Sequence, residues 1–129
     1  MVGLRDETGA AIVEFAIILP ILMLLVMGII QFGFIFNGQI TLTSAVREGA
    51  RYAVVGNTDA DVVKRVQDSS TALLLSIPTV TIDRDVNDGE SLTVSANGTV
   101  NIIMPFLNIF TGNQVNLKAE STMRVEKSI

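Results

Sequence analysis

A long apolar run near the start of the chain is interrupted by only one charge. Within residues 10–36 the only ionisable side chain is Glu14. About 20 apolar residues are enough to cross a bilayer as a helix. A helical pattern continues to Val55, which makes 46 residues from Ala10 and a length of roughly 69 Å at 1.5 Å per residue. We therefore expect a single helix that crosses a membrane and projects out of it.

Proline and glycine should weaken this helix. Pro20 lacks an N–H, so it should kink the helix or leave a carbonyl unpaired. Gly28, Gly33 and Gly38 lower the helix propensity further. Each of these glycines, considered alone, is explained more simply as an ordinary residue of a membrane helix than as a break in it.

A second helix is predicted after a break at Gly56, a residue that suits a helix C-terminus. Thr58 followed three residues later by Asp61 is typical of an N-cap. Apolar residues at helical spacing extend from there to Leu75. We expect a sheet to cover the apolar face of this helix.

Beyond Pro78, apolar and polar residues alternate as they do in strands. The alternation predicts strands around residues 80–82, 92–96, 100–104 and 115–125. Asn97 and Gly98 form a turn signal between the second and third of these, although Gly98 could also mark a bulge. The apolar loop "PFLNIFTGNQ" (residues 105–114) should pack on something, most simply the domain's own helix. The predicted class is α+β: a long N-terminal membrane-spanning helix, then a small domain with one further helix packed on a three- to four-stranded antiparallel sheet.

The composition removes several classes of function. The chain has no cysteine and no histidine, which excludes thiolate metal sites, redox chemistry and most catalytic triads. Its net charge of -4 and its 5% aromatic residues give neither a basic stripe nor a stacking surface for nucleic acid. We identify no catalytic residue, no metal site and no cofactor, and we expect that the chain is not an enzyme.

The residues around the start of the apolar run resemble a processing signal. Gly9, four further residues, then Glu14 and Phe15 at the start of a long apolar helix resemble the class III signal of type IV pilin-like proteins. In that family a membrane prepilin peptidase cuts after the glycine, and the glutamate then pairs with the amino terminus of a neighbouring subunit. The resemblance implies that Gly9 precedes the cut, that Ala10 becomes the amino terminus and that Glu14 is the assembly carboxylate.

Elementary electrostatics agrees with that role for Glu14. A charge in the membrane costs roughly 3 kcal/mol on insertion scales. An α-amino group is mostly cationic at neutral pH. At about 4 Å from the carboxylate, in an intermediate dielectric, the attraction between the two charges is on the order of 4 kcal/mol. Alternatively, Glu14 lies near the membrane edge and reaches water by snorkelling.

A second block narrows the family. The segment "TSAVREGARYAVVG" (residues 43–56), following "VEFAIILPILMLL" and "GIIQFGFIF", closely resembles TadE-like proteins, the pseudopilins of tight-adherence (Flp-type) pilus systems. The resemblance covers roughly residues 9–56, with a weaker echo in "STMRVE" (residues 121–126).

The same block carries two features that do not depend on the family. Small residues recur every four positions and allow another helix to approach closely; they are Ala45, Gly49 and Ala53. Three charged residues cluster beside them, Arg47, Glu48 and Arg51, in which Glu48 and Arg51 have the spacing of a helical ion pair. These features indicate either a contact and ion pairs between subunits or a solvated helix end.

The resemblance implies a structural role as a minor pilin or pseudopilin in Tad (Flp-type) pilus assembly and adhesion. Residues 1–9 would be the leader, residues 10–55 the assembly helix, and residues 56–129 an exported α+β pilin-like domain. The implied partners are prepilin peptidase, other pilin or pseudopilin subunits of the same or another chain, and the inner-membrane assembly platform. The chain would cross the cytoplasmic membrane once, with its N-terminus in the cytoplasm, and would enter the extracellular pilus on assembly.

Other interpretations remain open. The chain could be the major subunit of a TadE-like filament, or a membrane-anchored adaptor that does not polymerise. The distribution of basic residues also runs against the expected orientation, since Arg5 alone lies on the cytoplasmic side and Arg47 and Arg51 lie on the other.

Overall fold

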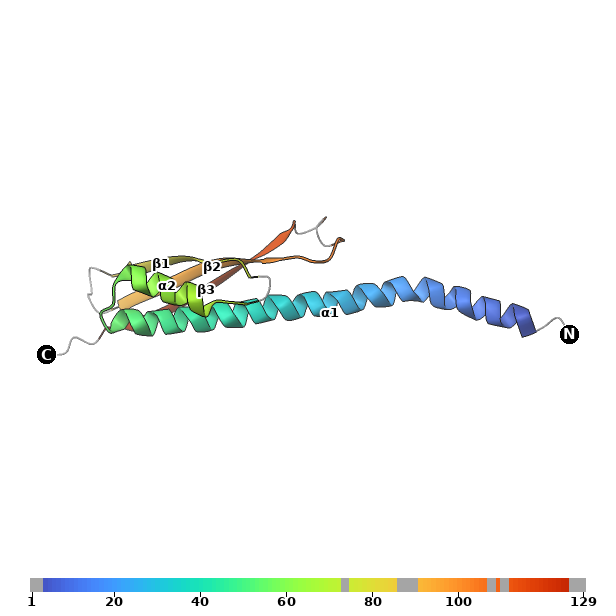
Figure 1. The fold of residues 1–129 in the computed structure, drawn as a ribbon, viewed down its shortest axis with the longest axis horizontal. Coiled ribbons are helices and arrows are strands. Elements are labelled where there is room, and N and C mark those ends of the chain that lie inside the picture. Colours follow the sequence, from blue (N-terminus) through green and yellow to red (C-terminus); the bar gives the residue numbers. More distant parts are fainter. Residues whose placement is uncertain (1–3, 73–74, 86–90, 107–108, 110–111, 126–129) are drawn as a thin grey trace.

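The chain consists of one very long helix, a short helix and three strands. The computed structural model describes residues 4–72, 75–85, 91–106, 109 and 112–125. The elements follow the chain in the order α1 (Leu4–Val54), α2 (Asp59–Ser69), β1 (Thr79–Arg84), β2 (Ser91–Asn101) and β3 (Gln114–Arg124) (Figure 1). The predicted α+β class, with its long N-terminal helix, is confirmed.

Helix α1 is continuous over 51 residues in spite of Pro20. Figure 1 shows a gentle bend in its N-terminal half, the half that holds Pro20. A bend is what a missing N–H in the helical ladder produces. The N-terminal half extends away from the rest of the chain, and the other elements gather along the C-terminal half.

The sheet is antiparallel, and β2 is its central strand. The pairing of β2 with β3 runs from Ser91 opposite Arg124 to Asn101 opposite Gln114 without skipping a residue. Gly98 therefore forms neither a turn nor a bulge, and the two strands predicted on either side of it are one. A Cβ at Gly98 would lie 3.1 Å from Leu75 Cδ1, so a larger residue there would require the leucine side chain to shift slightly.

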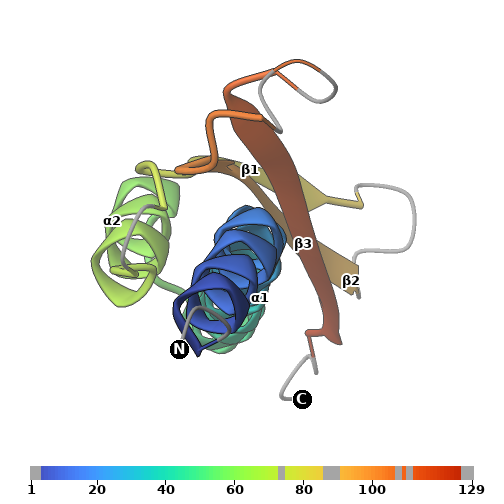
Figure 2. The same ribbon diagram turned by 90° about the vertical axis from the view of Figure 1, so that its right-hand side faces the viewer.

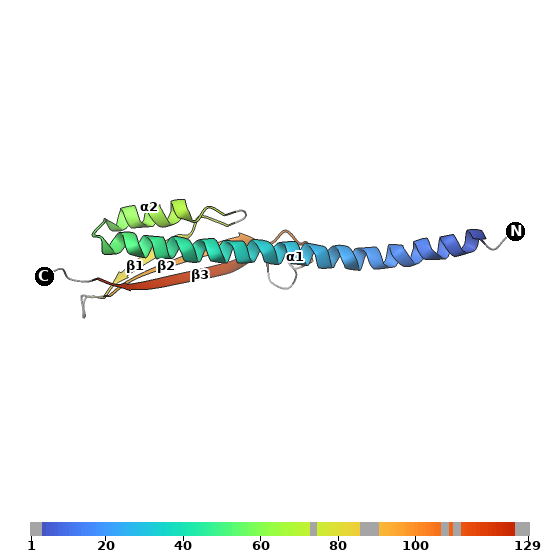
Figure 3. The same ribbon diagram turned by 90° about the horizontal axis from the view of Figure 1, so that it is seen from below.

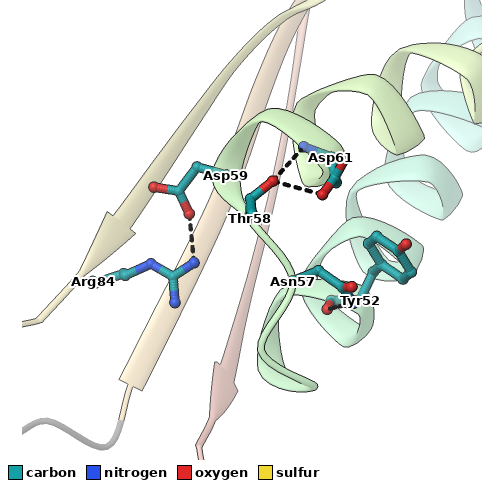
Figure 4. Close-up of polar contacts among 6 residues, drawn as sticks. All are labelled: Tyr52, Asn57, Thr58, Asp59, Asp61 and Arg84. Carbon is teal, nitrogen blue, oxygen red and sulfur yellow. Dashed lines mark hydrogen bonds and ion pairs between the residues drawn. The ribbon is translucent and has the colours of Figure 1, made fainter.

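Helix α2 begins where the sequence predicts. The Thr58 hydroxyl oxygen accepts the Asp61 N–H at 3.3 Å, which is the predicted N-cap (Figure 4). Gly56, at φ +96°, follows the end of α1 as expected.

The predicted end of α2 is wrong. The helix ends at Ser69, and the backbone N–H of the next residue, Ser70, donates to the carbonyl of Gln67. Leu75, to which the helical spacing extended, instead forms an isolated bridge with Val100 of β2. The spacing of apolar residues could not show that this leucine belongs to the core beside the sheet.

The core lies between the sheet and α1, not between the sheet and α2. Figure 2 shows α1 between α2 and β3, and Figure 3 shows α2 running antiparallel along the C-terminal half of α1. Val62 and Val66 of α2 are fully buried and lie against Gly49 of α1. The expectation that the sheet covers α2 is therefore wrong, since α1 takes that place. The buried core residues are Leu42, Ala45, Val46, Ala50 and Ala53 from α1, Val62 and Val66 from α2, Leu92, Val94, Ala96 and Val100 from β2, and Leu117 and Ala119 from β3.

Short polar contacts fix α2 to its neighbours. Asn57 Nδ2 donates to the Tyr52 carbonyl at 2.8 Å, which closes the connection between the helices (Figure 4). Arg84 of β1 forms an ion pair with Asp59 at the start of α2. Gln67 Nε2 donates to the carbonyl of Pro78, just before β1. Among the described residues, these polar contacts join α2 to the β1 edge of the sheet.

Candidate assembly site

The N-terminal half of α1 presents an apolar surface that no other described element covers along most of its length. Every residue described from Gly9 to Ile30 is exposed except Gly28, which is half-buried. The most apolar stretch has a mean hydropathy of 2.7 and is 0% buried. A surface this apolar requires lipid or another protein chain to cover it. By length and composition, α1 fits a single-pass membrane protein.

Glu14 lies on this exposed surface beside Phe15, which is 61% exposed. It makes no hydrogen bond and no ion pair with any residue that the structure describes. Gly9 and Ala10 lie one turn earlier in the same helix, so the predicted cleavage bond is helical in this structure. The geometry thus leaves the Glu14 carboxylate open to a partner from another molecule.

The small residues near the end of α1 serve a contact within the chain. Ala45 and Ala53 are 1% and 2% exposed, and Gly49 is also buried. A Cβ at Gly49 would lie 2.2 Å from Val66 Cγ2, so α2 is the helix that approaches this face. The predicted close approach of another helix is found, but the helix is α2 of the same chain. A contact between this face and another subunit is therefore corrected, because α2 and the sheet already fill the space.

Glu48 pairs with α2 and not with Arg51 as the helical spacing predicted. Its carboxylate accepts hydrogen bonds from Arg65 Nε at 2.9 Å and from Ser69 Oγ at 3.1 Å. The hydrogen bond from Arg65, followed by that from Ser69, holds the pKa of Glu48 below its ordinary value of 4.5, and the charges of Arg65 and Arg51 act in the same direction. Because the folded-state pKa is lowered, the stabilisation from this group is present above pH 4.5 and is lost as the pH falls through the folded-state pKa.

Two arginines remain open beside that pair. Arg47 and Arg51 are exposed and, within the described part of the chain, neither makes an ion pair. They line a shallow groove together with Tyr52, whose ring lies 5.9 Å from the Arg65 guanidinium carbon. Ion pairs from Arg47 and Arg51 to another subunit therefore stay a prediction, whereas Glu48 is already engaged.

Sequence reasoning missed Gln31, a buried glutamine on α1. Its side chain is 2% exposed; Oε1 accepts the Ile103 N–H at 2.8 Å, and Nε2 donates to the Asn101 carbonyl at 3.3 Å. A signal was available, because Gln31 is the only polar side chain between Glu14 and Asn37. A lone amide in an apolar run needs a partner, and here the partner is the backbone that follows β2.

Among the described residues, no three acidic side chains lie close enough together to hold a metal ion.

Comparison with known families gives a match over most of the long helix α1. Residues 9–51 match the model of a family described as TadE-like protein. The matched segment begins at Gly9, includes Glu14 and ends at Arg51, so the predicted resemblance to TadE-like proteins is confirmed over residues 9–51. The remaining residues of the predicted resemblance, 52–56 and 121–126, lie outside the match. The match associates the chain with the Tad pilus system. No curated protein and no solved structure matches the chain.

Proposed function

We propose that this chain is a minor pilin or pseudopilin that takes part in assembly of Tad (Flp-type) pili and in the adhesion they mediate. The observation that carries the proposal is the TadE-like match over residues 9–51. Residues 1–9 are then a leader that prepilin peptidase removes, residues 10–55 the assembly helix and residues 56–129 the exported domain. The chemistry is association with other subunits and with the assembly platform, and no enzymatic activity is proposed.

The exposed half of α1 supports this role. In the cytoplasmic membrane, with the amino terminus in the cytoplasm, lipid covers the apolar surface. Outside the membrane, only the helices of other subunits could cover it. Glu14, which lacks a partner within the described residues, then meets the α-amino group of a neighbouring Ala10, and the attraction is comparable with the roughly 3 kcal/mol cost of inserting the charge.

The first test replaces Glu14. Glu14→Val removes the charge and makes the helix easier to insert, so the membrane level should hold while recovery in sheared pili falls at least tenfold, as loss of about 1.4 kcal/mol or more predicts. Glu14→Gln keeps the shape and loses the charge, and it should fail nearly as badly if charge pairing matters. The measurement is the amount of each variant in sheared pili, normalised to its membrane level. Recovery of Glu14→Val at the wild-type level would contradict pairing and favour a snorkelling carboxylate.

The second test concerns processing. Intact-mass spectrometry of the membrane form, made together with its peptidase, should show Ala10 as the amino terminus. Gly9→Leu should block maturation, because a bulky side chain replaces the small residue before the cut. A mature chain that still begins at Met1 or Val2 would exclude processing and favour the non-polymerising adaptor. The number of copies per pilus would then separate a minor subunit from the major one.

A further inference from the structure

The segment that follows β2 lies against the membrane-spanning part of α1. Met104, Pro105 and Phe106 form one wall of a cleft, and residues of α1 from Pro20 to Met27 form the other. Every described residue that lines this cleft is apolar. Met104 is buried, whereas Phe106 is 66% exposed and Ile103 is 50% exposed.

Gln31 fixes the place where this segment leaves the sheet. Its buried amide bonds the backbone of both Asn101 and Ile103, the last residue of β2 and the residue two positions later. Because Met104 follows directly, the apolar segment begins at the level of Gln31 and continues toward the N-terminal end of α1.

The level of Gln31 can be compared with the thickness of a membrane. A span of about 20 residues counted from Ile12, the first large apolar residue of the exposed surface, ends at Gln31. Leu24, one of the cleft residues, lies seven positions before Gln31, or about 10 Å along the axis at 1.5 Å per residue. The segment around Phe106 therefore passes the outer end of the span and lies beside α1 inside it.

We propose that residues 103–106 insert into the membrane leaflet next to the folded domain, and that lipid acyl chains fill the cleft between this segment and α1. The inference rests on the proposed single-pass anchoring. Acyl chains are the occupant because the cleft shares a wall with the membrane-spanning helix and all its described lining residues are apolar. The depth suits an interfacial segment, which enters the acyl boundary by about 5–10 Å. Pro105 has no N–H to desolvate, which lowers the penalty for placing irregular backbone there.

Tryptophan fluorescence can test this directly, because the natural chain has no tryptophan. Phe106→Trp and Ile103→Trp each place one probe in the segment. Leu24→Trp is the control for a membrane-spanning position, and Val55→Trp, at a residue that is 82% exposed at the other end of α1, is the control for water. Each full-length variant is reconstituted in phosphatidylethanolamine and phosphatidylglycerol vesicles with or without lipids brominated on their acyl chains.

The expected result is a blue-shifted emission and strong quenching by brominated lipid for Phe106→Trp, of the same order as for Leu24→Trp. Ile103→Trp should be quenched mainly by bromine near the headgroup, because it lies closer to Gln31. Val55→Trp should be unaffected. If Leu24→Trp is quenched while Phe106→Trp and Ile103→Trp behave like Val55→Trp, the inserted segment is overturned and the membrane anchoring stands. If Leu24→Trp is not quenched, α1 does not span the bilayer, and both proposals fall.

Discussion

Gly49 shows how the absence of one side chain decides where a whole helix lies. The space that a Cβ would need at Gly49 is occupied by Val66 Cγ2, only 2.2 Å away. Val66 is fully buried in the core, so moving it would disturb its other contacts. The close packing of α2 on α1 therefore depends on glycine at this position.

Replacing Gly49 should destabilise the domain even though alanine favours helices. Gly49→Ala gains up to about 1 kcal/mol of helix propensity, but overpacking a filled core costs typically about 1–3 kcal/mol. We expect a net loss of stability, measured by urea unfolding of the full-length protein in detergent micelles, and a partial recovery when Val66→Ala is added. Gly33→Ala, at a glycine with open space around it, is the control and should not lower stability. A Gly49→Ala protein as stable as the wild type would show that α2 can shift without loss.

At the residue scale, the sequence predicted interactions whose partners are close along the chain. Thr58 and Asp61 are three positions apart, and their cap was identified correctly. For Glu48 the sequence predicts a pair with Arg51, because only the spacing within one helix can be read from a sequence. Its actual partner, Arg65, is 17 positions away, and that pairing exists only because α2 folds back onto α1.

At the scale of elements, Gln31 connects the end of β2 to α1. The Ile103 N–H and the Asn101 carbonyl both depend on its amide, and the amide is removed from water. Both bonds are partly buried, and a hydrogen bond of this kind contributes about 0.5–1.5 kcal/mol. The sheet is thereby tied to the helix at the edge of the exposed apolar surface.

Gln31→Leu should loosen this connection. The side chain keeps a similar size but loses both hydrogen bonds, so the Ile103 amide should exchange with deuterium at least tenfold faster if as little as about 1.4 kcal/mol of local stability is lost. Gln39→Leu is a matched control, because Gln39 also donates to a backbone carbonyl, that of Lys118 at 3.0 Å, but in an exposed contact. Unchanged exchange at Ile103 in the Gln31 variant would contradict the role assigned to this amide.

The elements that were predicted wrongly share one cause. Asn97 and Gly98 carry a strong local turn signal, yet β2 runs straight through them because β3 pairs with them without a break. Likewise, apolar residues at helical spacing continue to Leu75, yet the helix ends at Ser69 because that leucine belongs beside β2. In both places tertiary pairing overrides a local preference, and a single sequence does not show which strand will pair with which.

At the scale of the whole molecule, one helix provides both an apolar segment long enough to span a membrane and the centre of the folded domain. The buried core residues of α1 begin at Leu42, while the uninterrupted exposed stretch of the helix ends near Ile30, beyond which buried and exposed residues alternate. Gln31 and the partly buried Phe34 and Ile35 lie between these two parts. The folded domain thus begins within the helix, well before Gly56.

Truncation should reveal that boundary. A fragment that begins at Ile30 keeps Gln31 and every core residue of the described chain, so it should fold and unfold cooperatively without a membrane. A fragment that begins at Ile40 loses Gln31, Phe34, Ile35 and the close packing at Gly38, and should be less stable to urea. Equal stability of the two fragments, measured by circular dichroism, would show that residues 30–39 add nothing to the domain.

The continuity of α1 also has a mechanical consequence. Between the apolar surface and the core the chain has no flexible linker, because the same hydrogen-bonded helix runs through both. A force or torque applied to the sheet is therefore transmitted along the helix axis to the segment around Glu14, because no flexible linker extends to absorb it. If such a molecule is drawn out of a bilayer, the domain and the apolar half of α1 move together as one rigid unit. The force needed is then set by the lipid contacts broken at each step.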